Sequence, residues 1–227
     1  MNLKSIYEGK VLEALPIAGG VVFAYVSDTT EEGKTVVSYR HINFETGRTN
    51  SVTKKIFQLA KFGANYQKIE EQALHHLSTL STSLDDGKTF LVERDGAVKL
   101  LDNEGKSIFF SSFLYKKEAP YAIASNKNAV WASFKEGNAI IKYDIELLRE
   151  ELRIGGGNHE NSFLAPTGLF LKDDFLWVCN EGSKKIWKVN IKNYEVSEAY
   201  TFKEPVYSYM QTAGLELVVL SSGLYLL

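Results

Sequence analysis

Two stretches of the chain repeat the same order of apolar and polar positions. Residues 165–191 overlay residues 119–145 at an offset of 46 positions, without a gap. In each stretch a proline precedes a short alternating run, a polar turn and a more apolar run, which is the pattern of consecutive short strands. Self-similarity at a period of about 40–45 residues, built from short strands, is typical of a β-propeller. The identical pairs are Ala119/Ala165, Pro120/Pro166, Trp131/Trp177, Ile140/Ile186, Lys142/Lys188 and Ile145/Ile191.

The prolines mark where the repeated units begin. Proline has no backbone N–H, so in a sheet it is expected at the first residue of a strand or on an edge. We interpret Pro16, Pro120, Pro166 and Pro205 as the starts of blades, with one more start near residue 76. The sequence therefore predicts an all-β, five-bladed β-propeller that forms a single domain over residues 1–227. Six blades are the alternative, if the long first unit splits in two.

The last unit ends before its fourth strand. From Pro205 the repeat keeps its register as far as Tyr225 and then stops. A blade has four strands, and an unpaired edge promotes aggregation. We expect the segment Lys10–Leu15 to pair with Leu224–Leu227 and to close the ring. The alternative is that both termini are frayed edges.

The first two units are read from turns and alternation. Val21–Val26 and Thr35–Asn43 are expected strands, and residues 55–69 are expected to form a hairpin that turns at 62–65. A helical stripe fits the same segment, with a helical turn around Glu70–His76. In the second unit, Asp95–Gly96 between alternating runs predicts a tight hairpin. The strands expected there are Leu77–Leu84, Thr89–Glu93, Val98–Asp102 and Ser107–Phe110.

Charge and cysteine content narrow the class of protein. The net charge of −2 and the isoelectric point near 6.1 argue against a nucleic-acid partner or an anionic membrane. The single cysteine, Cys179, cannot form an internal disulfide, and its place beside an apolar strand position predicts a buried, inert thiol. The first residues make a poor signal peptide, and the apolar run Ala14–Val26 is too short to cross a bilayer. We therefore expect a cytoplasmic protein.

The segment PTGLFLKDDFLWVCNEGSKKIWKVN, residues 166–190, resembles the repeat of NHL-type, YVTN-type and gluconolactonase-like propellers. That repeat runs from P-[ND]-G through a D-G or D-D turn and [LV]-[WY]-V to I-x-[KR]. Residues 120–144 match it moderately, and the motif indicates an architecture rather than an activity.

The lactonase branch of that group implies a calcium- or zinc-type site in a central channel. Its ligands are Glu, Asn and Asp oxygens, and hard cations need several such oxygens together. The corresponding positions here carry Thr167 and Asn180 in one unit, and Tyr121 and Ser133 in the other. We therefore carry no metal site over and expect no cofactor, a channel Ca²⁺ being the alternative. The histidines have no metal-ligand spacing either.

The candidate ligand-binding residues lie in turns and crossings that share one face of such a fold. Three consecutive glycines in the loop 153–162 permit backbone shapes and close approaches that other residues do not. Function in such folds usually lies on loops, although a solvated surface loop is the simpler interpretation. The residues expected to meet there are Arg94, Lys135, Arg153, His159, Asn180 and Glu181.

Two functions fit this pattern. The first is a non-catalytic propeller that binds a protein, peptide or small ligand on its loop-rich face. The alternative is a lactonase- or hydrolase-like enzyme with a divergent channel site. Trp131 and Trp177 are interpreted as packing between sheets rather than as stacking platforms, and Trp187 is expected on the opposite strand face from Ile186.

Overall fold

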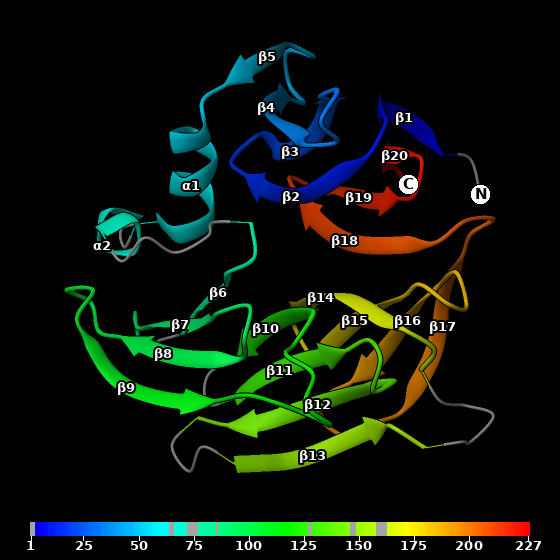
Figure 1. Cartoon of the computed structure of the whole chain (residues 1–227). Helices are drawn as coiled ribbons and strands as arrows, with labels where there is room; N and C mark the ends of the chain where they lie inside the picture. Colours follow the sequence, from blue (N-terminus) through cyan, green and yellow to red (C-terminus); the bar gives the residue numbers. More distant parts are fainter. Residues whose placement is uncertain are drawn as a thin grey trace. The chain divides into compact units, whose positions relative to one another are not determined.

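The computed structural model describes residues 3–63, 66–71, 77–84, 86–126, 129–145, 149–157 and 163–227, and these residues form five four-stranded antiparallel sheets (Figure 1). The predicted fold class, a five-bladed β-propeller, is confirmed, and the six-bladed alternative is wrong. We call the sheets blades 1 to 5 in chain order. By its internal contacts the chain divides into two compact units, Met1–Tyr66 with Ser208–Leu227, and Gln67–Tyr207. The single domain over residues 1–227 stays a prediction.

The second unit contains three blades, each a simple meander whose strands pair in sequence order. Their first strands begin at Leu80, Ala122 and Pro166, close to the predicted starts. Blade 2 consists of β6 (Leu80–Ser83), β7 (Thr89–Val92), β8 (Ala97–Leu101) and β9 (Ser107–Ser112). Blade 3 consists of β10 (Ala122–Asn126), β11 (Ala129–Phe134), β12 (Ala139–Asp144) and β13 (Arg149–Gly155). Blade 4 consists of β14 (Pro166–Lys172), β15 (Phe175–Asn180), β16 (Lys185–Asn190) and β17 (Val196–Thr201).

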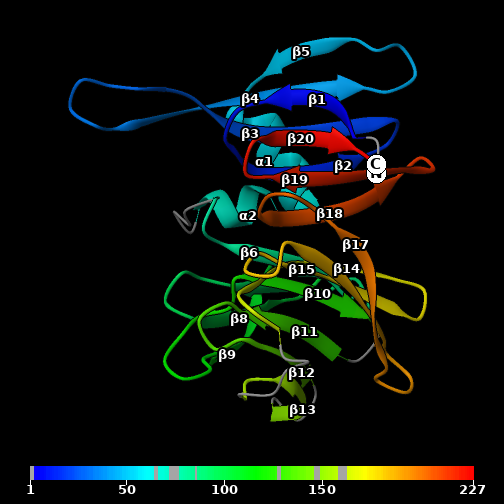
Figure 2. The ribbon, with the colours of Figure 1, turned by 90° about the vertical axis from the view of Figure 1, so that its right-hand side faces the viewer.

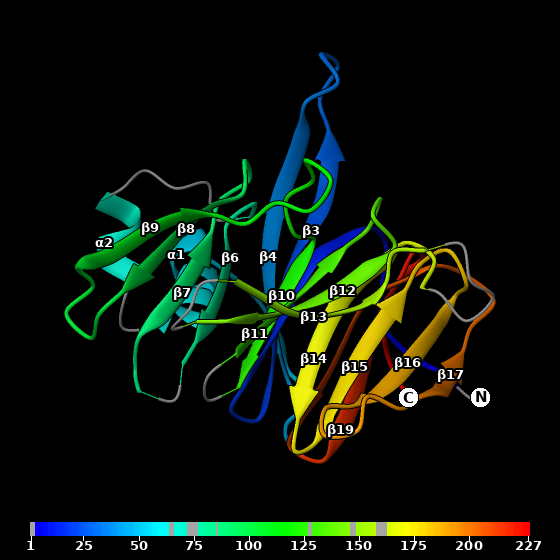
Figure 3. The same cartoon turned by 90° about the horizontal axis from the view of Figure 1, so that it is seen from below.

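The first unit contains blade 1, which carries a long hairpin. Its strands are β2 (Val11–Ile17), β3 (Gly20–Thr29), β4 (Thr35–Asn43) and β5 (Thr49–Val52). Strands β3 and β4 extend beyond both neighbours of their sheet, as Figures 2 and 3 show. Pro16 lies inside β2 rather than at its start, which is tolerated because β2 pairs only with β3.

Blade 5 is completed by the N-terminal strand, although not by the expected segment. Strand β1 (Lys4–Glu8) pairs with β20 (Gly223–Leu226), and Ser5 lies opposite Tyr225. The expected segment Lys10–Leu15 instead belongs to β2 of blade 1. That part of the prediction is wrong because Pro16 lies within β2 and does not mark a boundary between strands. The other strands of blade 5 are β18 (Val206–Thr212) and β19 (Leu215–Leu220).

The expected hairpin over residues 55–69 is wrong, since the segment forms α1 (Lys54–Phe62) and α2 (Tyr66–Glu71). The Thr53 side chain accepts a hydrogen bond from the Ile56 N–H and so caps α1. The expected helical stripe, which includes Ile56, Leu59, Tyr66 and Ile69, has the right phase only in α2, where Tyr66 and Ile69 are buried. In α1 its phase is wrong: Phe57 and Phe62 are buried, whereas Ile56 and Leu59 are each 44% exposed. Of the expected helical turn at Glu70–His76, residues 72–76 lie outside the described residues. No helix in the described ranges is long and apolar enough to cross a membrane.

The core of the second unit lies between neighbouring blades and follows the two-residue period of β11. Val130, Ala132 and Phe134 pack toward blade 2, whereas Trp131 packs toward blade 4 and is fully buried. The packing interpretation is therefore confirmed for Trp131. Trp177 is only half-buried, and its ring stacks with Tyr200 at a centroid distance of 6.2 Å.

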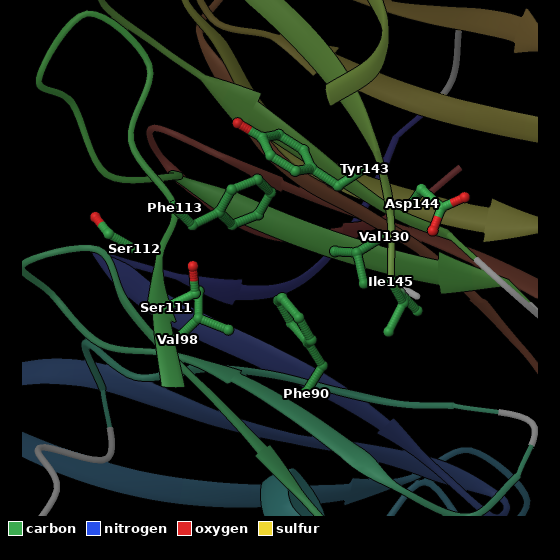
Figure 4. A pocket seen from close by; sticks show the side chains of 9 residues that line it. All are labelled: Phe90, Val98, Ser111, Ser112, Phe113, Val130, Tyr143, Asp144 and Ile145. Atoms are coloured by element: carbon green, nitrogen blue, oxygen red, sulfur yellow. The ribbon is translucent and has the colours of Figure 1, made fainter. Parts of the chain in front are cut away.

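A small cavity of about 20 Å³ lies between blades 2 and 3 (Figure 4). Two of its walls are the rings of Phe113 and Tyr143, which meet edge to face with 4.0 Å between centroids. A space of this size is enough for about one water molecule. The cavity is therefore a packing defect between sheets and is too small to hold a ligand.

Candidate ligand-binding site

The turns that follow the second strands of blades 3 and 4 meet through an ion pair. Lys135 Nζ lies 2.7 Å from Glu181 Oε2, and the two side chains are 30% and 23% exposed. Lys135 and Glu181 occupy the same position of the 46-residue repeat, so equivalent turns present opposite charges to each other. The carboxylate holds the pKa of Lys135 above its usual value. The structure thus brings together two of the six expected site residues.

A tyrosine covers this ion pair. The ring centroid of Tyr121 lies 5.9 Å from Lys135 Nζ, a distance at which a cation interacts with an aromatic face. Tyr121 is 42% exposed, yet its surroundings raise the pKa of the phenol to about 12, first through desolvation and then through the nearby Glu181 charge. Tyr207, near the start of β18, interacts electrostatically with both Tyr121 and Lys135. These four side chains, Tyr121, Lys135, Glu181 and Tyr207, are called the tyrosine–lysine cluster below.

Glu118 fixes the turn that carries Lys135. Its two carboxylate oxygens accept hydrogen bonds from the backbone N–H groups of Glu136, at 2.9 Å, and Gly137, at 2.8 Å. Hydrogen bonds to an ionised acceptor are stronger than neutral ones. Glu118 therefore orders the backbone on the C-terminal side of Lys135. Sequence analysis missed this role because Glu118 lies in the crossing between blades 2 and 3, outside the repeat.

Asn180 shapes the turn that carries Glu181. Its side chain is buried, its Oδ1 accepts the Leu164 N–H at 2.9 Å, and its Nδ2 donates to Ser183 Oγ at 2.5 Å. Both ends of the amide are therefore used within the fold. Asn180 lies next to the tyrosine–lysine cluster, but it positions the turn rather than offering a free group to a ligand.

Arg153 belongs to a second group, centred on Tyr115. Its Nη1 donates to the Tyr115 hydroxyl at 3.1 Å, its guanidinium carbon lies 5.2 Å from the ring centroid, and Nε lies 3.5 Å from Glu150 Oε1. These contacts raise the pKa of the guanidinium. The Lys116 ammonium also lies 5.2 Å from the Tyr115 ring centroid. The Tyr115 ring therefore interacts with two cations, Lys116 and Arg153.

The glycine-rich loop touches this second group. Gly156 has a φ of +78°, and a Cβ atom placed on it would lie 2.6 Å from the Tyr115 hydroxyl oxygen. Its N–H donates to the Asn138 carbonyl oxygen at 2.8 Å. The expectation that these glycines permit a close approach is therefore correct for Gly156, although the approaching group is part of the same chain.

Two of the expected site residues have other locations. Arg94 lines a separate cavity of about 350 Å³ together with Glu93 and residues 77–79. His159 lies outside the described residues. The role of the six residues in binding stays a prediction, and the structure groups Lys135, Asn180 and Glu181 apart from Arg153 and Arg94.

Side-chain hydroxyl groups connect strands of successive blades. Ser133 Oγ donates to the Thr167 carbonyl oxygen at 2.6 Å, and Thr167 Oγ1 donates to the Val206 carbonyl oxygen at 2.9 Å. Ser125 Oγ donates to the Ser83 carbonyl oxygen at 2.8 Å. Ser133 and Thr167 stand at positions where the lactonase resemblance implies metal ligands, but here they connect strands.

The described parts of the chain contain no group of three or more His, Cys, Asp or Glu side chains placed to hold a metal ion. Cys179 is fully buried, and burial raises the pKa of its thiol, so the thiolate that binds metals is disfavoured.

Comparison with solved structures shows the fold. The chain is similar to virginiamycin B lyase from Staphylococcus aureus, with a TM-score of 0.52 and 13% identity over 96% of this chain and 81% of that one. It is similar to a streptogramin B lyase, with a TM-score of 0.51 and 12% identity over 96% of this chain and 65% of that one. A computationally designed protein, Ika8, gives a TM-score of 0.50 and 12% identity over 95% of this chain and 57% of that one.

Both lyases are β-propellers, so the architecture-level resemblance stated from the sequence is confirmed. At these identities the likeness shows the fold alone. No protein-family model and no curated protein sequence matches the chain.

Proposed function

We propose that the protein is a non-catalytic propeller that binds a peptide, a protein segment or a small ligand at the tyrosine–lysine cluster. The observation that carries the proposal is the Lys135–Glu181 ion pair beneath the half-exposed ring of Tyr121. The cluster combines a cation, an anion and a partly exposed aromatic residue. Binding sites commonly join a few placed polar groups to an aromatic surface in this way.

Hydrogen bonds hold the turns that carry Lys135 and Glu181, and this favours a binding site at the cluster over the interpretation as a solvated surface. The Lys135 turn is held by Glu118, and the Glu181 turn is held by Asn180 and by the Glu181 N–H, which donates to the Ala165 carbonyl oxygen at 3.0 Å. Side chains whose supporting backbone is already ordered lose less entropy when a ligand binds. The ion pair is therefore pre-organised for a partner that replaces or bridges it.

Ligand-observed NMR with a library of short peptides and small acids and amines tests the proposal. We expect the library to contain ligands that bind the unmodified chain and whose binding signals disappear with the double variant Tyr121→Phe/Lys135→Met. The control is Lys192→Met, because Lys192 forms a comparable pair with Asp174 at 2.6 Å, where both side chains are exposed. The proposed site would be contradicted by ligands that bind the double variant as well as they bind the unmodified chain. It would also be contradicted if no compound of the library bound the unmodified chain.

The alternative function is a lactonase- or hydrolase-like enzyme. It is favoured by the Tyr121 phenol, which is protonated near neutral pH, beside the Glu181 carboxylate. A protonated phenol close to a carboxylate is a candidate general acid. The names of the two similar lyases suggest streptogramin B and virginiamycin B as substrates for a first assay.

The enzyme alternative is tested with a panel of lactones and with virginiamycin B, followed by mass spectrometry, and by measuring the divalent-metal content of the purified protein. Turnover that is lost in Tyr121→Phe or in Glu181→Gln would favour the enzyme over the binding module. A metal-free protein with no turnover would favour the binding module.

A further inference from the structure

The hairpin of blade 1 leaves a strand edge open. Strand β5 pairs with β4 only as far as Tyr39, opposite Val52, so the segment Thr35–Ser38 has no strand on that side in the described sheet. On its other side the segment pairs with β3, where Val36 lies opposite Asp28 and Val37 lies opposite Val26. Figures 2 and 3 show this part of the hairpin projecting from blade 1.

The pairing of β3 fixes which backbone N–H and C=O groups of β4 point toward the open edge. The Val26 N–H donates to the carbonyl oxygen of Lys10, the residue before β2, so it does not face β4. In an antiparallel ladder, two residues that lie opposite each other either both direct their backbone N–H and C=O groups toward each other or both direct them away. Val37, opposite Val26, therefore directs its N–H and C=O toward the open edge, as does Thr35 two positions away. Val36 directs its own backbone groups toward β3.

This edge lacks the usual protection against strand addition. Natural edges carry a lysine, a proline or an inward charge, or they are interrupted by a bulge. The segment reads Thr-Val-Val-Ser and contains none of these residues. The opposite edge of the hairpin does carry a bulge, between Val26 and Asp28. The β4 edge is therefore the one open to a further strand.

We infer that the β4 edge of blade 1 pairs with the same edge of a second copy of this chain, antiparallel about a two-fold axis at Val36. In this register Thr35 and Val37 exchange hydrogen bonds with the partner's Val37 and the partner's Thr35. Val36, 39% exposed, then faces the partner's Val36 in a pair without backbone hydrogen bonds, where side chains approach most closely.

Charge and symmetry favour a second copy over an unrelated strand. A two-fold interface requires a patch that is complementary to itself. Lys34 would lie opposite the partner's Ser38, so no like charges meet directly. The three central residues, Thr35, Val36 and Val37, thus supply two hydrogen-bonded pairs and one apolar contact across the axis. The interface is small, so the dimer is weak and forms only at high concentration.

Sedimentation equilibrium from about 10 μM to about 1 mM, the range suited to so small an interface, tests the inference. We expect the mass to rise from 25.5 kDa toward twice that value. Val36→Lys places two like charges on the axis and should keep the protein monomeric, and Val37→Pro should do the same by removing the outward N–H. The matched control is Val196→Lys on β17, since Val196 is 40% exposed, and it should dimerise like the unmodified chain.

A cysteine at the axis gives a direct measurement. The Cα atoms of a pair without backbone hydrogen bonds lie about 4.5 Å apart, within the range that a disulfide spans. Val36→Cys should therefore form a covalent dimer under mild oxidation by copper phenanthroline, whereas Val196→Cys should not. The native Cys179 is buried and does not interfere. A constant mass of 25.5 kDa up to the highest concentration, or a dimer that persists in Val36→Lys, would overturn the inference.

Discussion

The Ser133 hydroxyl donates a hydrogen bond to the Thr167 carbonyl oxygen, and the two oxygen atoms lie 2.6 Å apart. The same hydroxyl accepts the Ala122 N–H at 3.1 Å. One fully buried side chain thus joins a contact within blade 3 to a contact with blade 4. Its removal would leave a buried carbonyl and a buried N–H with fewer partners.

Ser133→Ala should therefore destabilise the fold by about 1–3 kcal/mol, the cost of leaving buried polar groups unsatisfied. Ser125→Ala removes a similar bond, to the Ser83 carbonyl oxygen, at a more exposed position and should cost less. Urea unfolding of both variants measures the difference. Equal losses for the two substitutions would show that burial does not set the cost.

A comparison of Gly156 with Gly33 distinguishes the cost of backbone strain from the cost of a steric contact. An alanine at a positive φ costs about 1–2 kcal/mol in any surroundings. Gly33 has nearly the same φ, +77° against +78°, but nothing lies within 4 Å of its added Cβ, whereas the Tyr115 hydroxyl oxygen lies 2.6 Å from that of Gly156. Thermal unfolding should therefore show a larger loss for Gly156→Ala than for Gly33→Ala.

The contact with Tyr115 can be removed independently. In the background of Tyr115→Phe, which deletes the hydroxyl, the additional cost of Gly156→Ala should become smaller. The cost of Gly33→Ala should not change in that background. If the double variant Tyr115→Phe/Gly156→Ala loses the full sum of the two single effects, the clash with the hydroxyl is not the cause.

Tyr121 should make the fold sensitive to alkali. Its pKa is raised to about 12 in the folded protein, above the ordinary value of 10.0. Between these two values the unfolded chain releases the phenol proton and the folded chain retains it, so stability falls as the pH rises. Tyr121→Phe should flatten this part of the stability curve, measured by chemical unfolding between about pH 9 and pH 12. Tyr194→Phe, at a 38% exposed position, is the control.

Lys61 and Glu13 form an ion pair inside the first unit. Lys61 Nζ lies 2.8 Å from Glu13 Oε2, and the lysine side chain is only 5% exposed. Burial raises the pKa of Glu13, and the Lys61 ammonium opposes that shift. Lys61→Met should cost about 3 kcal/mol because it leaves the carboxylate without its partner, and the double variant with Glu13→Gln should recover part of the loss. A double-mutant cycle of unfolding free energies without coupling would contradict this interpretation.

The blades that carry the repeat were predictable from sequence because one period fixes both strand order and strand face. Trp131 shows this, since its repeated aromatic position predicted packing between sheets, and the side chain is fully buried. Lys135 and Glu181 were expected on one face for the same reason: they occupy equivalent turns. Their direct ion pair depends on turn geometry that the repeat does not specify.

The errors lie where the repeat gives no information. The buried face of α1 depends on the position of a neighbouring sheet, so the sequence did not distinguish Phe57 from Ile56 as the core residue. Glu118 and Tyr115 lie in a crossing without an equivalent elsewhere, and their roles depend on contacts distant in sequence. A polar turn residue next to a strand, such as Asn180, looks the same in the sequence whether or not its amide is used within the fold. Its expected role in binding stays a prediction.

The pairing of β1 with β20 has a consequence for the order of folding. A ribosome releases β1 long before β20, so β1 remains without its permanent neighbour while all the residues between the two strands are made. Contacts between such distant segments form slowly, because a long loop must close before they are gained. We therefore expect slow maturation of blade 5 during synthesis, with Lys4–Glu8 as the segment that a chaperone would shield meanwhile.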